Sequence, residues 1–129
     1  MAQVKIFGCS NYLKSNKARI SDIIHDCIVE KLKFPREKKC HRFFEMDASN
    51  YIMPEEKTEK YIIIEILMMA GREKETKKNL IKYLFHRFIT DMKLSPDDIE
   101  ICILESDPAN WGFRGMTGDE IKLNYTIKV

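Results

Sequence analysis

The sequence predicts an α+β fold of two layers, in which a mixed β-sheet carries two helices on one of its faces. Residues 1–47 and 60–107 each read as a β-α-β unit, and the second unit matches the first at an offset of 60 residues. A strictly alternating segment at about 119–129 adds an extra strand at the carboxyl end. With 129 residues, 44% of them hydrophobic, we expect a single domain over residues 1–129.

The first unit opens with a short strand and continues into a helix. Val4 and Ile6 alternate with polar residues, which predicts a strand that breaks at Gly8. A helix is expected over Ser15 to Lys33, because apolar residues recur there at steps of three and four along one face. Residues Cys40 to Met46 then read as the second strand.

The second unit opens with the strongest strand pattern of the chain. Tyr61 to Met69 is rich in β-branched residues and apolar on both sides of the pleat, which is typical of a central strand covered on both faces. Gly71 ends this strand, and a second helix is expected over Glu73 to Lys93. Ile99 to Ile103 alternates as the fourth strand, and Ile121 to Val129 as the last.

The offset of 60 residues holds along the apolar face of both helices and into the strands that follow. An offset that persists across a helix, a loop and a strand indicates a duplicated unit. The matching pairs are Ile20–Leu80, Ile24–Leu84, Ile28–Phe88, Leu32–Met92, Lys33–Lys93, Glu45–Glu105 and Asp47–Asp107.

Composition argues against several classes of function. The 22 basic and 20 acidic residues leave a net charge of +2, far from the concentrated positive charge of nucleic-acid-binding or membrane-surface proteins. The longest apolar run, Ile62 to Ala70, is interrupted by Glu65 and is too short to span a bilayer, so we expect a cytoplasmic protein. No metal site, cofactor or disulfide scaffold is predicted, because the cysteines lie far apart without a CxxC pair. They are Cys9, Cys27, Cys40 and Cys102.

The predicted architecture leaves one face of the sheet without a cover. A β-α-β crossover places its helix on one side of the sheet, so both predicted helices lie on the same side. The strand over Tyr61 to Met69 is nevertheless apolar on both sides. We therefore expect the second face to be covered by other copies of the chain, with the helices facing outward.

Two short segments are the most specific motifs in the chain. Ala70-Gly71-Arg72 lies where the third strand turns into the second helix, and Asn110-Trp111-Gly112-Phe113 follows the fourth strand. The second motif is similar to the Asn-Trp-Ser-Phe segment of decarboxylase-like members of the tautomerase superfamily. Residues 31–43 also resemble the helix exit and second strand of that subgroup, so nearly the whole chain resembles this superfamily, which includes 4-oxalocrotonate tautomerase, macrophage migration inhibitory factor and malonate semialdehyde decarboxylase.

The resemblance implies a homotrimer whose general base is an amino-terminal proline, left after methionine removal. In these enzymes burial and nearby cations bring the pKa of the amine toward neutrality. Here Met1 is followed by Ala2, so the family base is replaced by a primary amine that exists only if Met1 is removed. Without that removal, Ala2 is simply the first residue of a strand.

The resemblance also implies an anion-binding role for Arg72, which matches a family arginine that holds the substrate carboxylate. The alternative is an exposed arginine in the first turn of a helix. Ala70 stands where the decarboxylase pattern has a second arginine, and Lys38 stands where it has an aspartate. This charge reversal argues against decarboxylation or hydration by the family route.

The second motif supplies further candidate substrate-binding residues. Trp111 and Phe113 could wall an apolar pocket, and Arg114 replaces what is commonly a glycine and could add a second cation. Trp111 could instead serve trimer packing, which is a common role for a single tryptophan.

Three functions remain open on the sequence. The first is enol-keto tautomerisation, or a related proton transfer, on a small 2-oxo acid, weakened by the missing proline. The second is a non-catalytic trimer that binds a small anionic ligand or a protein partner. The third is a ferredoxin-like binding module, because that fold shares the β-α-β-β-α-β order.

Overall fold

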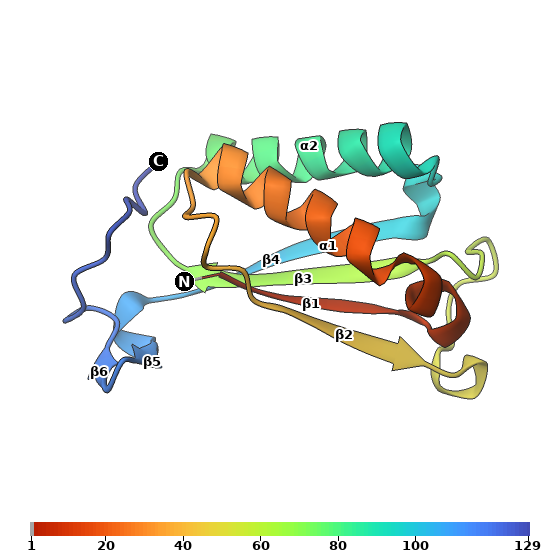
Figure 1. Cartoon of the computed structure of the whole chain (residues 1–129), viewed down its shortest axis with the longest axis horizontal. Coiled ribbons are helices and arrows are strands. Elements are labelled where there is room, and N and C mark those ends of the chain that lie inside the picture. The colour runs from red at the N-terminus through yellow and green to blue at the C-terminus, as the bar shows by residue number, and fades with distance from the viewer. Residues whose placement is uncertain (1) are drawn as a thin grey trace.

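The computed structural model describes residues 2–129, so the expectations about Met1 lie outside the described residues. Residues 2–129 form six strands, two long helices and three short 3-10 helices (Figure 1). The elements are β1 (Ala2–Cys9), α1 (Ser10–Leu32), β2 (His41–Met46), β3 (Ile62–Met69), α2 (Lys74–Met92), β4 (Ile99–Ser106), β5 (Gly112–Phe113) and β6 (Met116–Thr117). Within residues 2–129, no helix has the length and hydropathy needed to cross a membrane.

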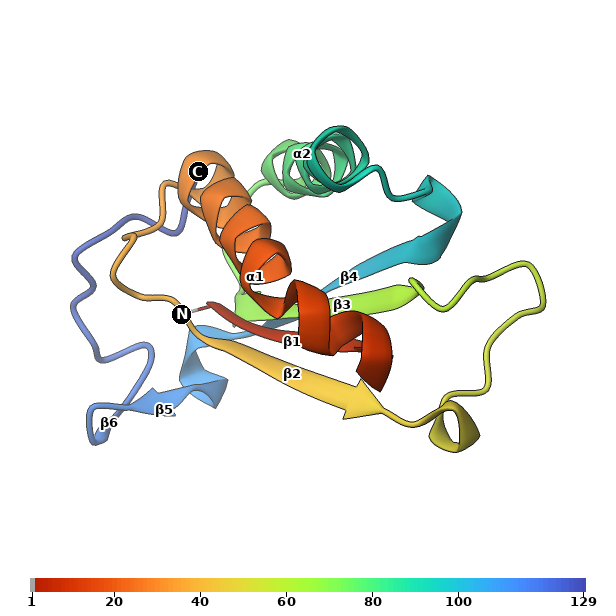
Figure 2. The same ribbon diagram turned by 45° about the vertical axis from the view of Figure 1, so that its right-hand side comes forward.

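The sheet has the strand order β2-β1-β3-β4, and both helices cover the same face of it (Figures 1 and 2). The pairs β1–β2 and β3–β4 are parallel, whereas the central pair β1–β3 is antiparallel. This confirms the predicted mixed sheet with helices on one side. It also argues against the ferredoxin-like alternative, because in that fold a further strand separates the two strands of each unit.

The two β-α-β units share several structural details, which support the proposed internal repeat. Their parallel strand pairs have the same register, and both helices end in a left-handed residue. An ion pair between helix and sheet also recurs at matching positions. In the strands, Val4 lies opposite His41 and Ile64 opposite Ile101, and the left-handed helix ends are Lys33 and Lys93. The matching ion pairs are Lys17–Glu45 at 2.8 Å and Lys77–Glu105 at 2.7 Å.

The core lies between the sheet and the helices, while the opposite sheet face stays open in the single chain. Ile62, Ile64 and Ile66 of β3 are completely buried against the helices. On the open face, Phe44 and Leu104 are 39% and 43% exposed. In β3 itself this open side carries the half-buried Ile63 and Leu67 on either side of Glu65, so it is largely apolar, as predicted, and lacks a cover within residues 2–129.

The start of α1 differs from the expectation. The helix begins at Ser10 rather than Ser15, because Gly8 does not break the strand but continues it. A β-carbon at Gly8 would lie 3.1 Å from Leu13 and 3.2 Å from Ile62, so the glycine lets the first turn of the helix pack closely on the strand. Gly8 is therefore needed for the close approach of the helix to the strand, and not for a reversal of the chain.

The expected strand at 119–129 does not form within the described chain. These residues, which we call the C-terminal strap, run in an extended but irregular path along the end of the sheet. The end of the strap instead pairs with the start of α2. Glu73 N donates to Val129 O at 3.0 Å and Thr76 Oγ1 donates to the same atom at 2.7 Å. Pairing of the strap with a neighbouring subunit stays a prediction.

Candidate functional site

Several elements converge at one end of the sheet, beside the start of β1. Figures 1 and 2 show the α1–β2 connection, the β5–β6 hairpin and the strap at this end. They enclose a pocket of about 320 Å³. Its lining residues are Lys38, Lys39, Cys40, Phe113, Arg114 and Tyr125. The structure thus brings together three of the residues singled out in the sequence, which are Lys38, Phe113 and Arg114.

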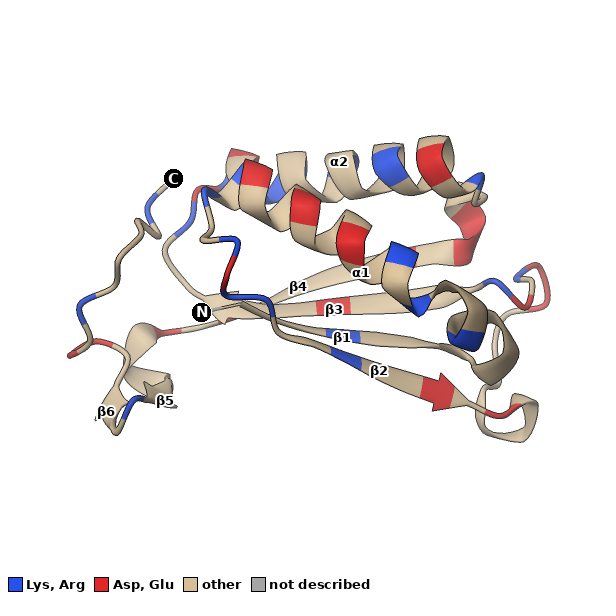
Figure 3. Cartoon of the chain, in the orientation of Figure 1, with Lys and Arg blue, Asp and Glu red and all other residues tan. Residues whose placement is uncertain are grey.

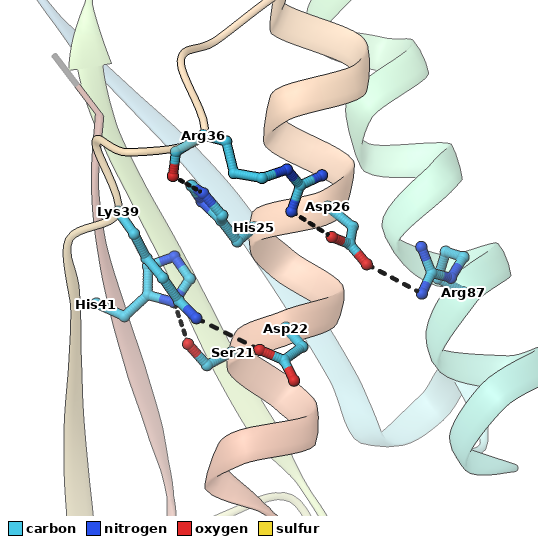
Figure 4. A network of polar contacts seen from close by, with 8 residues as sticks. All are labelled: Ser21, Asp22, His25, Asp26, Arg36, Lys39, His41 and Arg87. Carbon is cyan, nitrogen blue, oxygen red and sulfur yellow. Dashed lines mark hydrogen bonds and ion pairs between the residues drawn. The ribbon is translucent and has the colours of Figure 1, made fainter.

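The lysine wall of the pocket comes from the α1–β2 connection, which polar contacts hold in place. Lys38 N donates to Pro35 O at 3.1 Å, and Val4 N donates to Cys40 O at 3.0 Å. Behind this wall, a ring nitrogen of His25 lies 2.6 Å from Arg36 O (Figure 4). The connection is therefore anchored to both β1 and α1, and its lysines hold a fixed place at the pocket.

The same network includes two further contacts between α1 and the start of β2. Lys39 Nζ lies 3.4 Å from an oxygen of Asp22, and His41 Nδ1 lies 2.7 Å from Ser21 Oγ (Figure 4). Burial, helped by the charge of Lys39, lowers the pKa of His41 from 6.5 to about 4. His41 is therefore neutral at physiological pH and serves packing on α1.

The arginine wall comes from the turn of the β5–β6 hairpin. Arg114 and Gly115 form a two-residue turn, and both have positive φ, at 57° and 75°. A residue with a β-carbon loses roughly 1 kcal/mol in this conformation, and asparagine or glycine is usual there. The guanidinium of Arg114 lies 5.7 Å from the ring centre of Phe113. Arg114 therefore adopts an unfavourable backbone conformation at the position where its cation lines the pocket.

Arg72 lies buried beneath the strap, at the turn between β3 and α2. Arg72 is only 4% exposed, so the alternative of an exposed arginine in the first turn of a helix is wrong. Nη1 donates a long hydrogen bond of 3.4 Å to Met69 O, and neither Nε nor Nη2 has a partner among residues 2–129. Burial lowers the pKa of Arg72, although the group stays a cation. Two buried donors without partners on a planar fork fit a carboxylate.

The strap is packed tightly over the turn that carries Arg72. Gly71 has a φ of 139°, and a β-carbon there would lie 2.9 Å from Ile127. A glycine is thus required both by the backbone conformation and by the close approach of the strap.

The pocket has a positive field. Its lining includes three cationic side chains and no carboxylate. Neither Lys38 nor Arg114 belongs to an ion pair within residues 2–129. Figure 3 shows these cations as blue segments in the α1–β2 connection and at the tip of the hairpin. An anion fits this lining, whereas no group of three His, Cys, Asp or Glu side chains in the described chain could hold a metal ion.

Three predicted site residues, Ala2, Arg72 and Trp111, lie outside the lining of this pocket. Ala2 is 3% exposed and pairs with Met68 at the start of β1, at the same end of the sheet as the pocket. Trp111 is also buried, and its indole nitrogen donates to Ser106 O at 3.3 Å. The tryptophan therefore fixes the chain between β4 and the hairpin.

Tyr125 is a lining residue that the sequence reasoning missed. It belongs to the alternating segment at the carboxyl end, where it was counted as one of the apolar residues of a strand. Only the path of the strap reveals that its ring faces the pocket, and no sequence signal distinguished it from its neighbours.

Comparison with known proteins gives one family match. The model of a family described as tautomerase enzyme matches residues 38–114, which is more than half of the chain. The matched range begins at Lys38 and ends at Arg114, the two cations on opposite walls of the pocket.

Solved structures of similar fold cover nearly the whole chain. FG41 malonate semialdehyde decarboxylase, inhibited by 3-bromopropiolate, matches with a TM-score of 0.75 at 24% identity, covering 86% of this chain and 88% of that one. A fused 4-OT, described as an asymmetric trimer, matches with a TM-score of 0.79 at 19% identity, over 91% and 96%. Pt0534, inactivated by 2-oxo-3-pentynoate, matches with a TM-score of 0.81 at 16% identity, over 93% and 99%. At identities below 25%, these TM-scores establish a shared fold.

Proposed function

This chain belongs to the tautomerase family, and from that premise we propose that it catalyses enol-keto tautomerisation, or a related proton transfer, on a small 2-oxo acid. The observation that carries the proposal is Arg72, a buried guanidinium with two donors that lack partners among the described residues. Leaving such donors unsatisfied is costly for the folded chain. A bound carboxylate removes this cost, and the 2-oxo acid class supplies one next to an enolisable carbonyl.

In this proposal Arg72, which lies under the strap and outside the pocket lining, acts together with residues of the pocket walls. Arg72 holds the carboxylate through its planar fork, while Lys38 and Arg114 attract the anion and stabilise negative charge on the enolate. Phe113 supplies an apolar wall. After removal of Met1, the amine of Ala2 would act as the base, since an α-amino group of pKa about 8 needs only a small depression to act near neutrality.

We expect the activity to be weak. A proline at this position supplies a secondary amine of fixed geometry, whereas Ala2 supplies a primary amine without that constraint. A well-placed general base contributes about 10² to 10⁴-fold to the rate, so an impaired base lowers turnover by a large part of that factor.

The proposed assembly is a homotrimer in which the open sheet faces form the inner layer. Phe44 and Leu104 stand exposed on that face, and Phe7 and Phe44 stack there with ring centres 4.7 Å apart. Water-exposed aromatic and aliphatic side chains on a flat sheet favour association. The fused 4-OT of similar fold is described as a trimer.

A non-catalytic, trimeric binding protein for a small anion or a protein partner is the second candidate. It is favoured by Lys38, which replaces the aspartate of the decarboxylase pattern and adds a cation to a pocket without a carboxylate. Such a pocket suits anion binding without proton transfer, because its lining lacks a carboxylate base.

The two candidates are separated by following ketonisation of the enol of a 2-oxo acid through the loss of its ultraviolet absorbance. If the chain is an enzyme, we expect slow turnover that falls at least tenfold in Arg72→Met. The matched control is Arg87→Met, at an arginine of α2 that pairs with Asp26 and Asp91, and it should leave turnover unchanged. Intact mass spectrometry of the same sample reports whether Met1 is present. Turnover equal to the buffer rate, with the enol still bound, would leave only the binding protein.

A further inference from the structure

The pocket between the α1–β2 connection and the β5–β6 hairpin gathers more positive charge than one carboxylate needs. Lys38 and Lys39 line it from the connection and Arg114 lines it from the hairpin, and the lining contains no carboxylate. Neither Lys38, which is half-buried, nor Arg114 belongs to an ion pair within residues 2–129. Lys39 Nζ lies 3.4 Å from an oxygen of Asp22, so this charge is partly balanced. Two cations on opposite walls therefore lack a counter-charge in the described chain.

Aromatic rings hold both of these cations at the pocket. Lys38 Nζ lies 5.3 Å from the ring centre of Tyr125, and the guanidinium of Arg114 lies 5.7 Å from the ring centre of Phe113. Both rings line the same pocket. The face of an aromatic ring attracts a cation without neutralising its charge. The pocket thus combines apolar walls with two charges that remain available to an anion.

The backbone conformation of Arg114 is a second indication of a ligand. The residues other than glycine with positive φ within residues 2–129 are Lys33, Lys93 and Arg114. The two lysines directly follow helices, where a left-handed residue commonly ends the helical hydrogen bonding. Arg114 instead precedes Gly115 in the hairpin turn, where asparagine or glycine would avoid the backbone cost. Unfavourable backbone conformations concentrate at ligand-binding sites, so the side chain of Arg114 is the feature that points to a function.

We propose that this pocket binds the phosphoryl group of a small phosphate monoester. A phosphoryl group carries about two negative charges at neutral pH and presents three acceptor oxygens on different sides. It can therefore contact Lys38 and Arg114 on opposite walls at once, whereas a carboxylate has a single charge and two oxygens in one plane. The volume of about 320 Å³ fits a small molecule, and Phe113 and Tyr125 provide apolar contact for its organic part. The inference goes beyond the proposed function and does not depend on Arg72, which lies outside this lining.

Isothermal titration calorimetry with phenyl phosphate, phenyl sulfate and benzoate tests the charge and shape of the ligand. Phenyl phosphate and phenyl sulfate share one shape, but at about pH 8 the phosphate carries a second negative charge, because its second pKa is about 6. We expect phenyl phosphate to bind about fivefold or more tightly than either of the other two probes, since the pocket is partly open to water. Absence of phenyl phosphate binding, or equal affinity for phenyl sulfate or benzoate, would overturn the proposal.

Arg114→Asn and Lys93→Asn are matched variants for locating the site. Each removes one exposed cation from a left-handed position that suits asparagine, so the urea midpoint of both proteins should be unchanged or higher. Lys93 follows α2, at the far end of the sheet from the hairpin (Figure 1). Arg114→Asn should weaken phenyl phosphate binding about fivefold or more, and Lys93→Asn less than about twofold. Equal affinities in Arg114→Asn and wild type would show that phosphate binds elsewhere and would overturn the proposal.

Titration of the wild type with pyruvate keeps this inference apart from the proposed function. A wild type that binds pyruvate and turns over the enol, but does not bind phenyl phosphate, would overturn this inference alone. A wild type that binds phenyl phosphate through Arg114, but neither binds pyruvate nor turns over the enol, would overturn the proposed function alone.

Discussion

Replacing Arg72 with methionine should make the ligand-free protein more stable. Methionine keeps an unbranched apolar stem of similar length in the buried space and removes the charge. The change also removes two buried nitrogens that lack partners among residues 2–129, and each such donor costs about 1 kcal/mol or more. The hydrogen bond that is lost, to Met69 O at 3.4 Å, is long and therefore weak. We expect a gain of about 2 kcal/mol in the free energy of unfolding.

The matched control is Arg87→Met, because Arg87 is a paired arginine. Its guanidinium contacts Asp91 at 2.7 Å and Asp26 at 3.6 Å (Figure 4 shows the contact with Asp26). Removing one partner of a partly exposed ion-pair network lowers stability by about 1 kcal/mol. The two arginine substitutions should thus change stability in opposite directions.

The assay is urea unfolding of wild type and both variants at one protein concentration, since assembly makes stability depend on concentration. Adding pyruvate at 100 times its dissociation constant should raise wild-type stability by about 2.7 kcal/mol and leave Arg72→Met unchanged. If Arg72→Met loses 1 kcal/mol or more without ligand, as Arg87→Met does, the guanidinium has a partner in the assembled protein and does not serve as an anion site.

Three further predictions concern assembly, pH and the base. Leu104→Lys should raise the dissociation constant of the trimer about tenfold or more in sedimentation equilibrium, because it places a charge on the open sheet face. The control Ile52→Lys, at a residue that is 96% exposed, should leave this constant unchanged. A wild-type protein that is monomeric would contradict the proposed trimer. Folding lowers the pKa of His41 from 6.5 to about 4. As the pH falls, His41 therefore takes up a proton in the unfolded chain before it does so in the folded chain. This difference should remove about 2 kcal/mol from the free energy of unfolding between pH 6.5 and 4. His41→Gln should flatten this part of the pH profile, and an unchanged profile would show that other groups cause it. Ala2→Pro, with Met1 removed, should raise the rate of enol ketonisation, and no gain would indicate a pocket adapted to binding.

Hydrophobic periodicity predicted the two layers because it depends on which face of each element meets the core. The buried side of β3 and the apolar stripe of α2 both follow directly from this rule. Gly8 shows where the rule fails. A glycine inside a strand pattern is compatible with a break or with close packing, and only the contact with Leu13 decides between them.

The site was predicted less completely, because it depends on tertiary contacts of the strap. Residues 119–129 alternate like a strand, but a strand forms only beside an edge that offers backbone partners. The strap instead docks on the turn after Arg72, which buries this arginine and brings Tyr125 to the pocket. Neither the burial of Arg72 nor the place of Tyr125 follows from local patterns. Lys38, Phe113 and Arg114 were identified because they flank motifs with a family resemblance.

The proposed function depends on Arg72 as the binding group for the carboxylate of a small 2-oxo acid. Isothermal titration calorimetry of the wild-type protein with pyruvate tests this claim most directly, with Arg72→Met and Arg87→Met titrated alongside. We expect saturable binding at one site per chain in wild type and in Arg87→Met, and an affinity at least tenfold lower in Arg72→Met. Equal affinities in wild type and Arg72→Met, or no binding by wild type, would contradict it.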